Sequence, residues 1–248
     1  MGFQNTTPRA YLAPGVEGGW ASANPHVSLL QPNTGDLSDA NAASWKVGVG
    51  GAIVGRFAFA DVVTGLVTSA HPATGANFTD TAPGRVRVGF VQRDQVSLIT
   101  AWLAESGNVV QPGTGITLLS RGDVWAKFAA GAAVGSFVFA SFADGSAIAG
   151  ATSTAPTATG VTVTTVSGSP NVTAVAGGTL YPGQPVSGAG IPAGAYVVSV
   201  AGSTAVLSAN ATASASGVAV TQTTGILTPW RVDSLAAAGD IAKISVWG

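Results

Sequence analysis

The sequence predicts an all-β protein, in which a larger β domain carries a small inserted β module. Three observations lead to this prediction. Short runs alternate between apolar and polar residues, which is the period of a half-buried strand. The 34 Gly and 13 Pro residues separate these runs and disfavour helices. The stretch between Asp144 and Arg231 contains no Asp, Glu, Lys, Arg or His, whereas charged residues lie on both sides of it.

Residues 1–27 are predicted to form an extended arm, because the prolines and glycines of this stretch exclude a helix. The arm nevertheless carries three spaced aromatic residues, Phe3, Tyr11 and Trp20. Large aromatic side chains need a surface to pack against. That surface is either the chain's own domain or a neighbouring subunit, and the sequence leaves both alternatives open.

Residues 28–150 and 226–248 are predicted to form the larger domain, since charged residues return after residue 230. Asp144-Gly145 predicts a hairpin turn. Residues 94–107 fit both a helix and strands, because apolar residues recur there at helical spacing within a β neighbourhood. The expected strands of the domain are residues 45–49, 53–59, 86–91, 116–119, 124–128, 137–142, 230–232 and 241–247.

Residues 155–225 are predicted to form the inserted module. β-Branched residues occupy alternate positions in its short runs, most clearly in residues 161–166, and Gly and Pro lie between the runs. This pattern is typical of a small β-sandwich. Dense Thr and Ser supply polar surface without charge.

The charge content limits the classes of partner. Only 8% of the 248 residues are charged, and the net charge is −1. Nucleic-acid binding needs a basic face, so we expect no nucleic-acid partner. The most apolar run, residues 128–143, is shorter than the about 20 residues of a spanning helix, so we expect no membrane partner. Either hydroxyl groups and Gly backbone keep the uncharged surface hydrated, or partners cover much of it.

The sequence contains no recognised catalytic motif and no cysteine. His26 and His71 each stand next to a proline, without a neighbouring carboxylate cluster of the kind that binds a metal. Glu17, Glu105 and Asp123 allow a glycosidase pair in space, which nothing in their spacing supports. We therefore expect no enzyme activity, no cofactor and no metal site.

Several motifs, taken in their order along the chain, carry a family resemblance. They are residues 1–5 (MGFQN), 16–25 (VEGGWASANP), 55–58 (GRFA), 89–93 (GFVQR), 98–100 (LIT), 103–105 (LAE), 121–127 (RGDVWAK), 228–232 (TPWRV) and 238–245 (AGDIAKIS). This series resembles the structural cement proteins, or capsid decoration proteins, of tailed bacteriophages. The resemblance covers residues 1 to about 145 and 226–248. Residues 188–194 (GAGIPAG) look like part of a small β module that is common in phage virion and bacterial surface proteins.

The resemblance implies a jelly-roll-like larger domain on the outer surface of an icosahedral head. Cement proteins bridge neighbouring major capsid subunits and stabilise the expanded, DNA-filled capsid. The implied partners are the major capsid protein and further copies of the chain, as a dimer or trimer at capsomer junctions. Synthesis in the host bacterial cytoplasm follows from this reading, and the family brings no catalytic residues.

Aromatic residues are the expected contact anchors, because buried aromatic side chains dominate interface energetics. Phe3, Tyr11 and Trp20 of the arm are the first candidates for a capsid or subunit interface. Trp230 and Trp247 are the second candidates, with the core of the domain as the alternative location for both. The alternative function is a carbohydrate-binding or receptor-binding fibre component of the virion, in which exposed aromatics stack on sugars.

Overall fold

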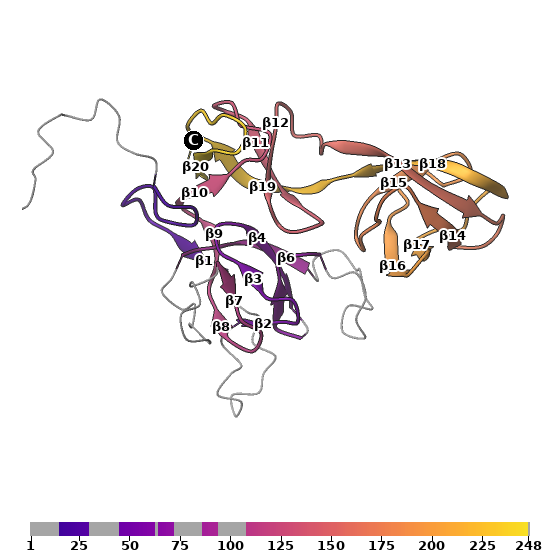
Figure 1. Cartoon of the computed structure of the whole chain (residues 1–248), viewed down its shortest axis with the longest axis horizontal. Coiled ribbons are helices and arrows are strands. Elements are labelled where there is room, and N and C mark those ends of the chain that lie inside the picture. Colours follow the sequence, from indigo (N-terminus) through magenta and orange to yellow (C-terminus); the bar gives the residue numbers. More distant parts are fainter. Residues whose placement is uncertain (1–14, 30–44, 63, 72–85, 94–107, 248) are drawn as a thin grey trace, which may run out of the picture.

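The computed structural model describes residues 15–29, 45–62, 64–71, 86–93 and 108–247 (Figure 1). These residues form strands, turns and irregular segments and contain no helix, so the all-β prediction is confirmed. No helix in this part of the chain is long and apolar enough to span a membrane. Residues 94–107, which the sequence leaves open between helix and strand, lie outside the described ranges.

The largest sheet has seven strands. They are β1 (Val27–Ser28), β2 (Trp45–Val47), β4 (Phe57–Asp61), β5 (Leu66–Thr68), β6 (Val86–Val91), β8 (Gly115–Ile116) and β9 (Leu118–Arg121). Across the sheet their order is β1-β9-β6-β4-β5-β2-β8. All pairs of neighbouring strands are antiparallel except β2 and β5, which are parallel.

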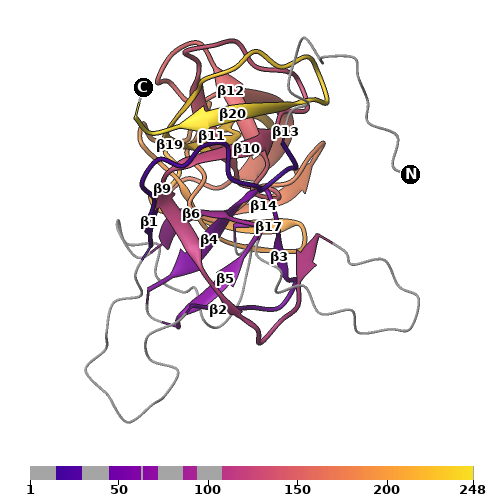
Figure 2. The same cartoon turned by 90° about the vertical axis from the view of Figure 1, so that its left-hand side faces the viewer.

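A second sheet of five strands lies above the first in both views (Figures 1 and 2). Its strands are β10 (Asp123–Lys127), β11 (Phe137–Ser141), β12 (Ala147–Gly150), β19 (Gly225–Val232) and β20 (Ile241–Ser245), in the order β10-β20-β19-β11-β12. Only Gly122 separates β9 from β10, so the chain passes there directly from one sheet into the other. The hairpin predicted at Asp144-Gly145 joins β11 to β12 and is confirmed.

Strand β4 shows how the alternating sequence builds two cores. Phe57 and Phe59 lie in the cluster between the two sheets, where the ring centroids of Phe57 and Trp230 are 5.4 Å apart. Ala58 and Ala60 point to the other face and pack into a second cluster. Successive side chains of a strand point to opposite faces, and all five residues of β4 are buried. The seven-stranded sheet is therefore covered on both faces at its centre.

Two strands predicted as single runs are divided. The run at residues 53–59 becomes β3 (Ala52–Ile53) and β4, because Gly55 has a φ of +83° and turns the chain between them. β3 pairs with β7 (Val109–Val110) in a small separate sheet. The run at residues 116–119 is divided between β8 and β9, which pair with different strands.

Residues 157–223 form a third sheet of six strands. They are β13 (Thr157–Thr165), β14 (Asn171–Ala176), β15 (Val186–Gly188), β16 (Val197–Ala201), β17 (Thr204–Leu207) and β18 (Ala215–Thr223), in the order β15-β18-β13-β14-β17-β16. The segments of β15 and β16, which stand at the two ends of this order, are hydrogen-bonded to each other. Val186 N donates to Ala195 O at 2.9 Å, and Val197 N donates to Gln184 O at 3.0 Å. The curled sheet thus closes around its own apolar cluster.

The six-stranded sheet is set to one side of the other two and is joined to them by two adjacent chain segments (Figure 1). At this junction, Thr224 N donates to Pro156 O at 2.8 Å. Gly183 and His71 form a second contact at the junction. They lie so close that a Cβ added to Gly183 would stand 3.0 Å from Nε2 of His71. The chain therefore enters and leaves the six-stranded sheet at nearly the same point.

Candidate functional site

Residues 15–27 of the predicted arm pack on the chain's own domain. Gly18 N donates to Trp125 O at 2.8 Å, and Trp125 N donates to Gly19 O at 3.1 Å. Ala21 N donates to Asp123 O at 3.0 Å. The arm therefore extends the five-stranded sheet at the outer edge of β10 and then joins the seven-stranded sheet as β1. For these residues, the surface that covers the arm belongs to the same chain.

The buried carboxylate of Asp123 holds this arrangement together. Its Oδ2 accepts hydrogen bonds from Ser22 Oγ at 2.7 Å and Asn24 Nδ2 at 2.8 Å. Its Oδ1 accepts one from Ser245 Oγ at 2.7 Å, and Lys243 Nζ lies 3.4 Å from Oδ2. Burial alone would raise the pKa of Asp123, but these four partners outweigh burial and hold it below its usual value. The ionised carboxylate thus joins the arm to β20 through β10.

Lys243 links this carboxylate to the surface. Its Nζ lies 2.6 Å from Oδ2 of Asp233, a residue whose side chain is 44% exposed. The hydrogen bond to Asp233 is the main cause that raises the pKa of Lys243, and the charge of Asp123 adds to it. Both effects keep the ammonium charged beside Asp123.

The motifs that carry the family resemblance meet around this arm. Arg93 N donates to Gly18 O at 2.8 Å, and Arg93 Nε donates to Glu17 O at 2.9 Å. A Cβ on Gly18 would stand 2.9 Å from Gly55 N, so the backbones of two motifs touch. The segments 16–25, 55–58, 89–93, 121–127 and 238–245 are far apart in sequence and adjacent at this place.

The aromatic candidates have different locations. Trp20 is 38% exposed, and its ring centroid is 4.4 Å from that of His26. Trp247 is 48% exposed, near the end of the described chain. Trp230 is fully buried in the core between the sheets and presents no surface to a partner. Phe3 and Tyr11 lie outside the described residues.

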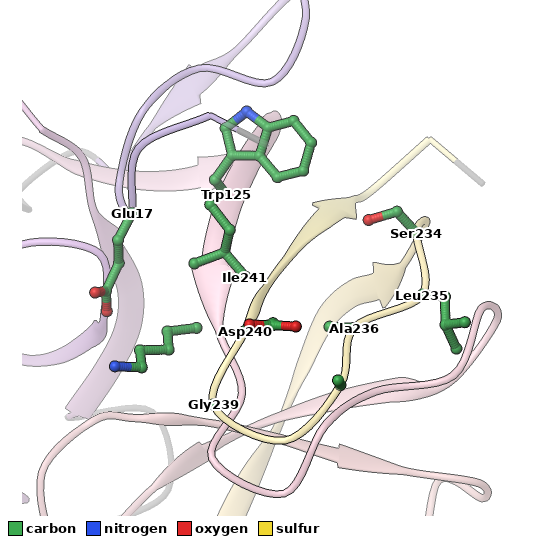
Figure 3. Close-up of a pocket in the computed structure, with 10 residues that line it drawn as sticks. Glu17, Trp125, Ser234, Leu235, Ala236, Gly239, Asp240 and Ile241 are labelled. Atoms are coloured by element: carbon green, nitrogen blue, oxygen red, sulfur yellow. The ribbon is translucent and has the colours of Figure 1, made fainter. Parts of the chain in front are cut away.

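A concavity lies beside the arm on the edge of the five-stranded sheet (Figure 3). Glu17 of the arm and the segment of Ser234 and Leu235 lie on opposite sides of it, with Trp125 and Ile241 between them. The Leu235 side chain is 76% exposed. The residues that line the concavity are Glu17, Trp125, Lys127, Ser234, Leu235, Ala236, Ala237, Gly239, Asp240 and Ile241. This mixture of apolar side chains and single charges suits the binding of another chain.

The described residues include no group of three or more His, Asp or Glu side chains that could hold a metal ion. Asp123, one of the carboxylates considered for glycosidase chemistry, is engaged by the partners that fix the arm. Glu105 lies outside the described residues. No local pattern in the sequence predicts the concavity, because its walls come from three separate segments of the chain.

A comparison with protein-family models identifies the relatives of this chain. The model of the XM1 gp53 minor capsid protein family matches residues 3–177, which is more than half of the chain. The chain belongs to this family of phage minor capsid proteins. The resemblance to a phage structural protein family is thereby confirmed. No curated protein and no solved structure matches the chain.

Membership in the XM1 gp53 minor capsid protein family makes this a structural protein of a phage virion, associated with other capsid components. The matched region begins in the arm and contains both β9 and β10. It ends at residue 177, directly after β14, so it includes only part of the six-stranded sheet. A structural role in the capsid agrees with the expectation of a protein without enzyme activity.

Proposed function

We propose that this minor capsid protein is a cement protein, which binds the outer surface of the phage head and bridges major capsid subunits. The observation that carries the proposal is the fixed arm. Asp123 holds the arm on the edge of β10 through Ser22 and Asn24, and fourteen residues precede Gly15 in the sequence. Fourteen residues reach at most about 50 Å when extended, which is enough to contact a neighbouring subunit.

The benefit to the capsid follows from mass action. A protein that binds only the expanded, assembled lattice stabilises that lattice by its binding free energy. The gain is about 2.7 kcal/mol for each site when free protein is present at about one hundred times its Kd. Many copies on one head multiply this effect, so modest binding at each site resists the pressure of packaged DNA.

The proposed contacts are aromatic side chains. Phe3 and Tyr11 of the arm and the exposed rings of Trp20 and Trp247 are the candidates for interfaces with the major capsid protein or with further copies of the chain. Trp230 is no longer a candidate, because its side chain is fully buried in the core. A dimer or trimer at capsomer junctions remains our proposal for the assembled state, with synthesis in the host bacterial cytoplasm.

We propose the same division into parts that the sequence suggested. Residues 28–150 and 226–248 form the capsid-binding domain, and residues 155–225 form a module that projects away from the capsid. Support comes from the separate apolar cluster of the six-stranded sheet and from the single junction at Pro156 and Thr224.

Electron cryo-microscopy of phage heads with and without this protein tests the proposal. We expect density that bridges adjacent major capsid subunits on the outer surface, with the arm traced from residue 15 towards a neighbour. Density found only at the tail would refute the cement function and would favour a receptor-binding fibre component instead.

A further inference from the structure

We propose that the concavity beside β10 binds a surface segment of the major capsid protein, in which an apolar side chain stands next to a lysine or arginine. This inference rests on the proposed cement function. It assigns the capsid-facing surface to one described place in the fold, rather than to the arm alone.

Apolar side chains that line the concavity are exposed to solvent. Leu235, which lines the concavity, is 76% exposed. Trp125 and Ile241 line the same concavity and are only partly buried. Exposed apolar side chains that gather at one hollow mark a site of interaction with another molecule. An apolar side chain of a partner would fill the space between Trp125 and Leu235.

The charged residues of the lining indicate which charge the partner carries beside its apolar side chain. Glu17 and Asp240 contribute two carboxylates and Lys127 contributes one ammonium group, so the lining has a net charge of −1. Complementary charge across an interface favours the correct partner and its orientation. A lysine or arginine next to the apolar anchor would therefore match this site, whereas an acidic neighbour would be repelled.

The position of the concavity connects it with the arm. Gly15 lies directly on the Trp125 side chain, since an added Cβ at Gly15 would stand only 2.2 Å from Trp125 Nε1. Gly15, the first described residue of the arm, therefore lies at the rim of the concavity. A capsid subunit that the arm contacts would thus have the concavity within reach, and the two contacts would form one continuous interface.

Binding of the full-length chain to stripped heads tests this assignment. We expect Leu235→Asp to weaken binding at least about tenfold, because the leucine side chain that the partner would cover is lost and a charge faces an apolar partner. Val49→Asp is the matched control, since Val49 is 93% exposed but lies in a turn of the seven-stranded sheet. This control should bind as the wild type does. Equal binding by wild type and Leu235→Asp would overturn the inference and leave the cement function intact.

Two charge variants test the chemistry of the partner. Asp240→Lys should weaken binding, because it removes a carboxylate that faces the proposed cation, whereas Lys127→Glu should not weaken it. The opposite pattern would overturn the assignment of a basic partner.

Sedimentation of the free chain distinguishes a second copy as the occupant. If Leu235→Asp abolished self-association without changing capsid binding, the site would belong to an interface between copies and the inference would fail. Absence of any binding by the wild-type chain would instead refute the cement function itself.

Discussion

Removing the charge of Asp123 is expected to release the arm. In Asp123→Asn, the side chain keeps its size, but the atom in place of one carboxylate oxygen becomes a donor. Ser22 and Asn24 both donate to Oδ2, and Ser245 donates to Oδ1, so the amide loses acceptors whichever way it is turned. A hydrogen bond to a charged group contributes about 1.5–3 kcal/mol, and such contributions are not additive. We therefore expect a loss of about 2–4 kcal/mol in the free energy of unfolding.

Urea unfolding and amide hydrogen exchange together measure this effect. Exchange should accelerate at the amides of Gly18, Ala21 and Trp125, whose hydrogen bonds join the arm to β10. Asp233→Asn is the matched control, because Asp233 is the exposed partner of Lys243, and an exposed ion pair contributes only about 0–1 kcal/mol. If the two variants had the same stability and the same exchange at these amides, Asp123 would not be the residue that fixes the arm.

Three further predictions follow from the packing. Because the pKa of Asp123 is lowered, its contribution is complete above about pH 4 and is lost as pH falls through the lowered pKa. The protection of arm amides, measured as exchange relative to the intrinsic rate at each pH, should therefore fall below about pH 4 in the wild type but not in Asp123→Asn. Gly145→Ala should destabilise the fold by more than about 2 kcal/mol in urea, because the added Cβ would meet Phe57 O at a φ of +69°, whereas Gly113→Ala meets no atom within 4 Å and should lose only about 1 kcal/mol. Val172→Ala should cost about 2 kcal/mol and lower the thermal transition of the six-stranded sheet alone, and a shift of a single common transition would contradict this.

Local patterns in the sequence predict the strands, but they do not predict which strands meet. Alternation places Phe57 and Phe59 on one face of β4, and Asp144-Gly145 marks a hairpin that the structure confirms. Neither pattern shows that Gly55 divides a run or that the outer strands of the six-stranded sheet pair. These features depend on contacts between distant residues, which local periodicity does not encode.

The candidate site also depends on contacts between distant residues, which local sequence patterns do not predict. The sequence presents Asp123 as one of three carboxylates that allow a glycosidase pair. Its actual partners cannot be found from local patterns, because Ser22, Asn24 and Ser245 stand about a hundred residues away from it. The sequence leaves two locations for the Trp230 side chain, the core of the domain and an interface, because an aromatic residue in an alternating run fits both. Only the pairing of β19 with β11 and β20 places its ring in the core.

The uncharged stretch leads to a last prediction about capsid binding. All 21 Lys, Arg, Asp and Glu residues, 10 basic and 11 acidic, lie outside residues 145–230, so the six-stranded sheet has no charge to offer a partner. Because Thr224 N lies 2.8 Å from Pro156 O, an Asn-Gly turn can replace residues 157–223 without moving the flanking strands. The shortened chain should bind capsids with the affinity and the salt dependence of the full-length chain, because charged contacts that salt screens come only from the remaining part. If the shortened chain folds, as judged by amide exchange at β10, yet fails to bind, the six-stranded sheet itself contacts the capsid.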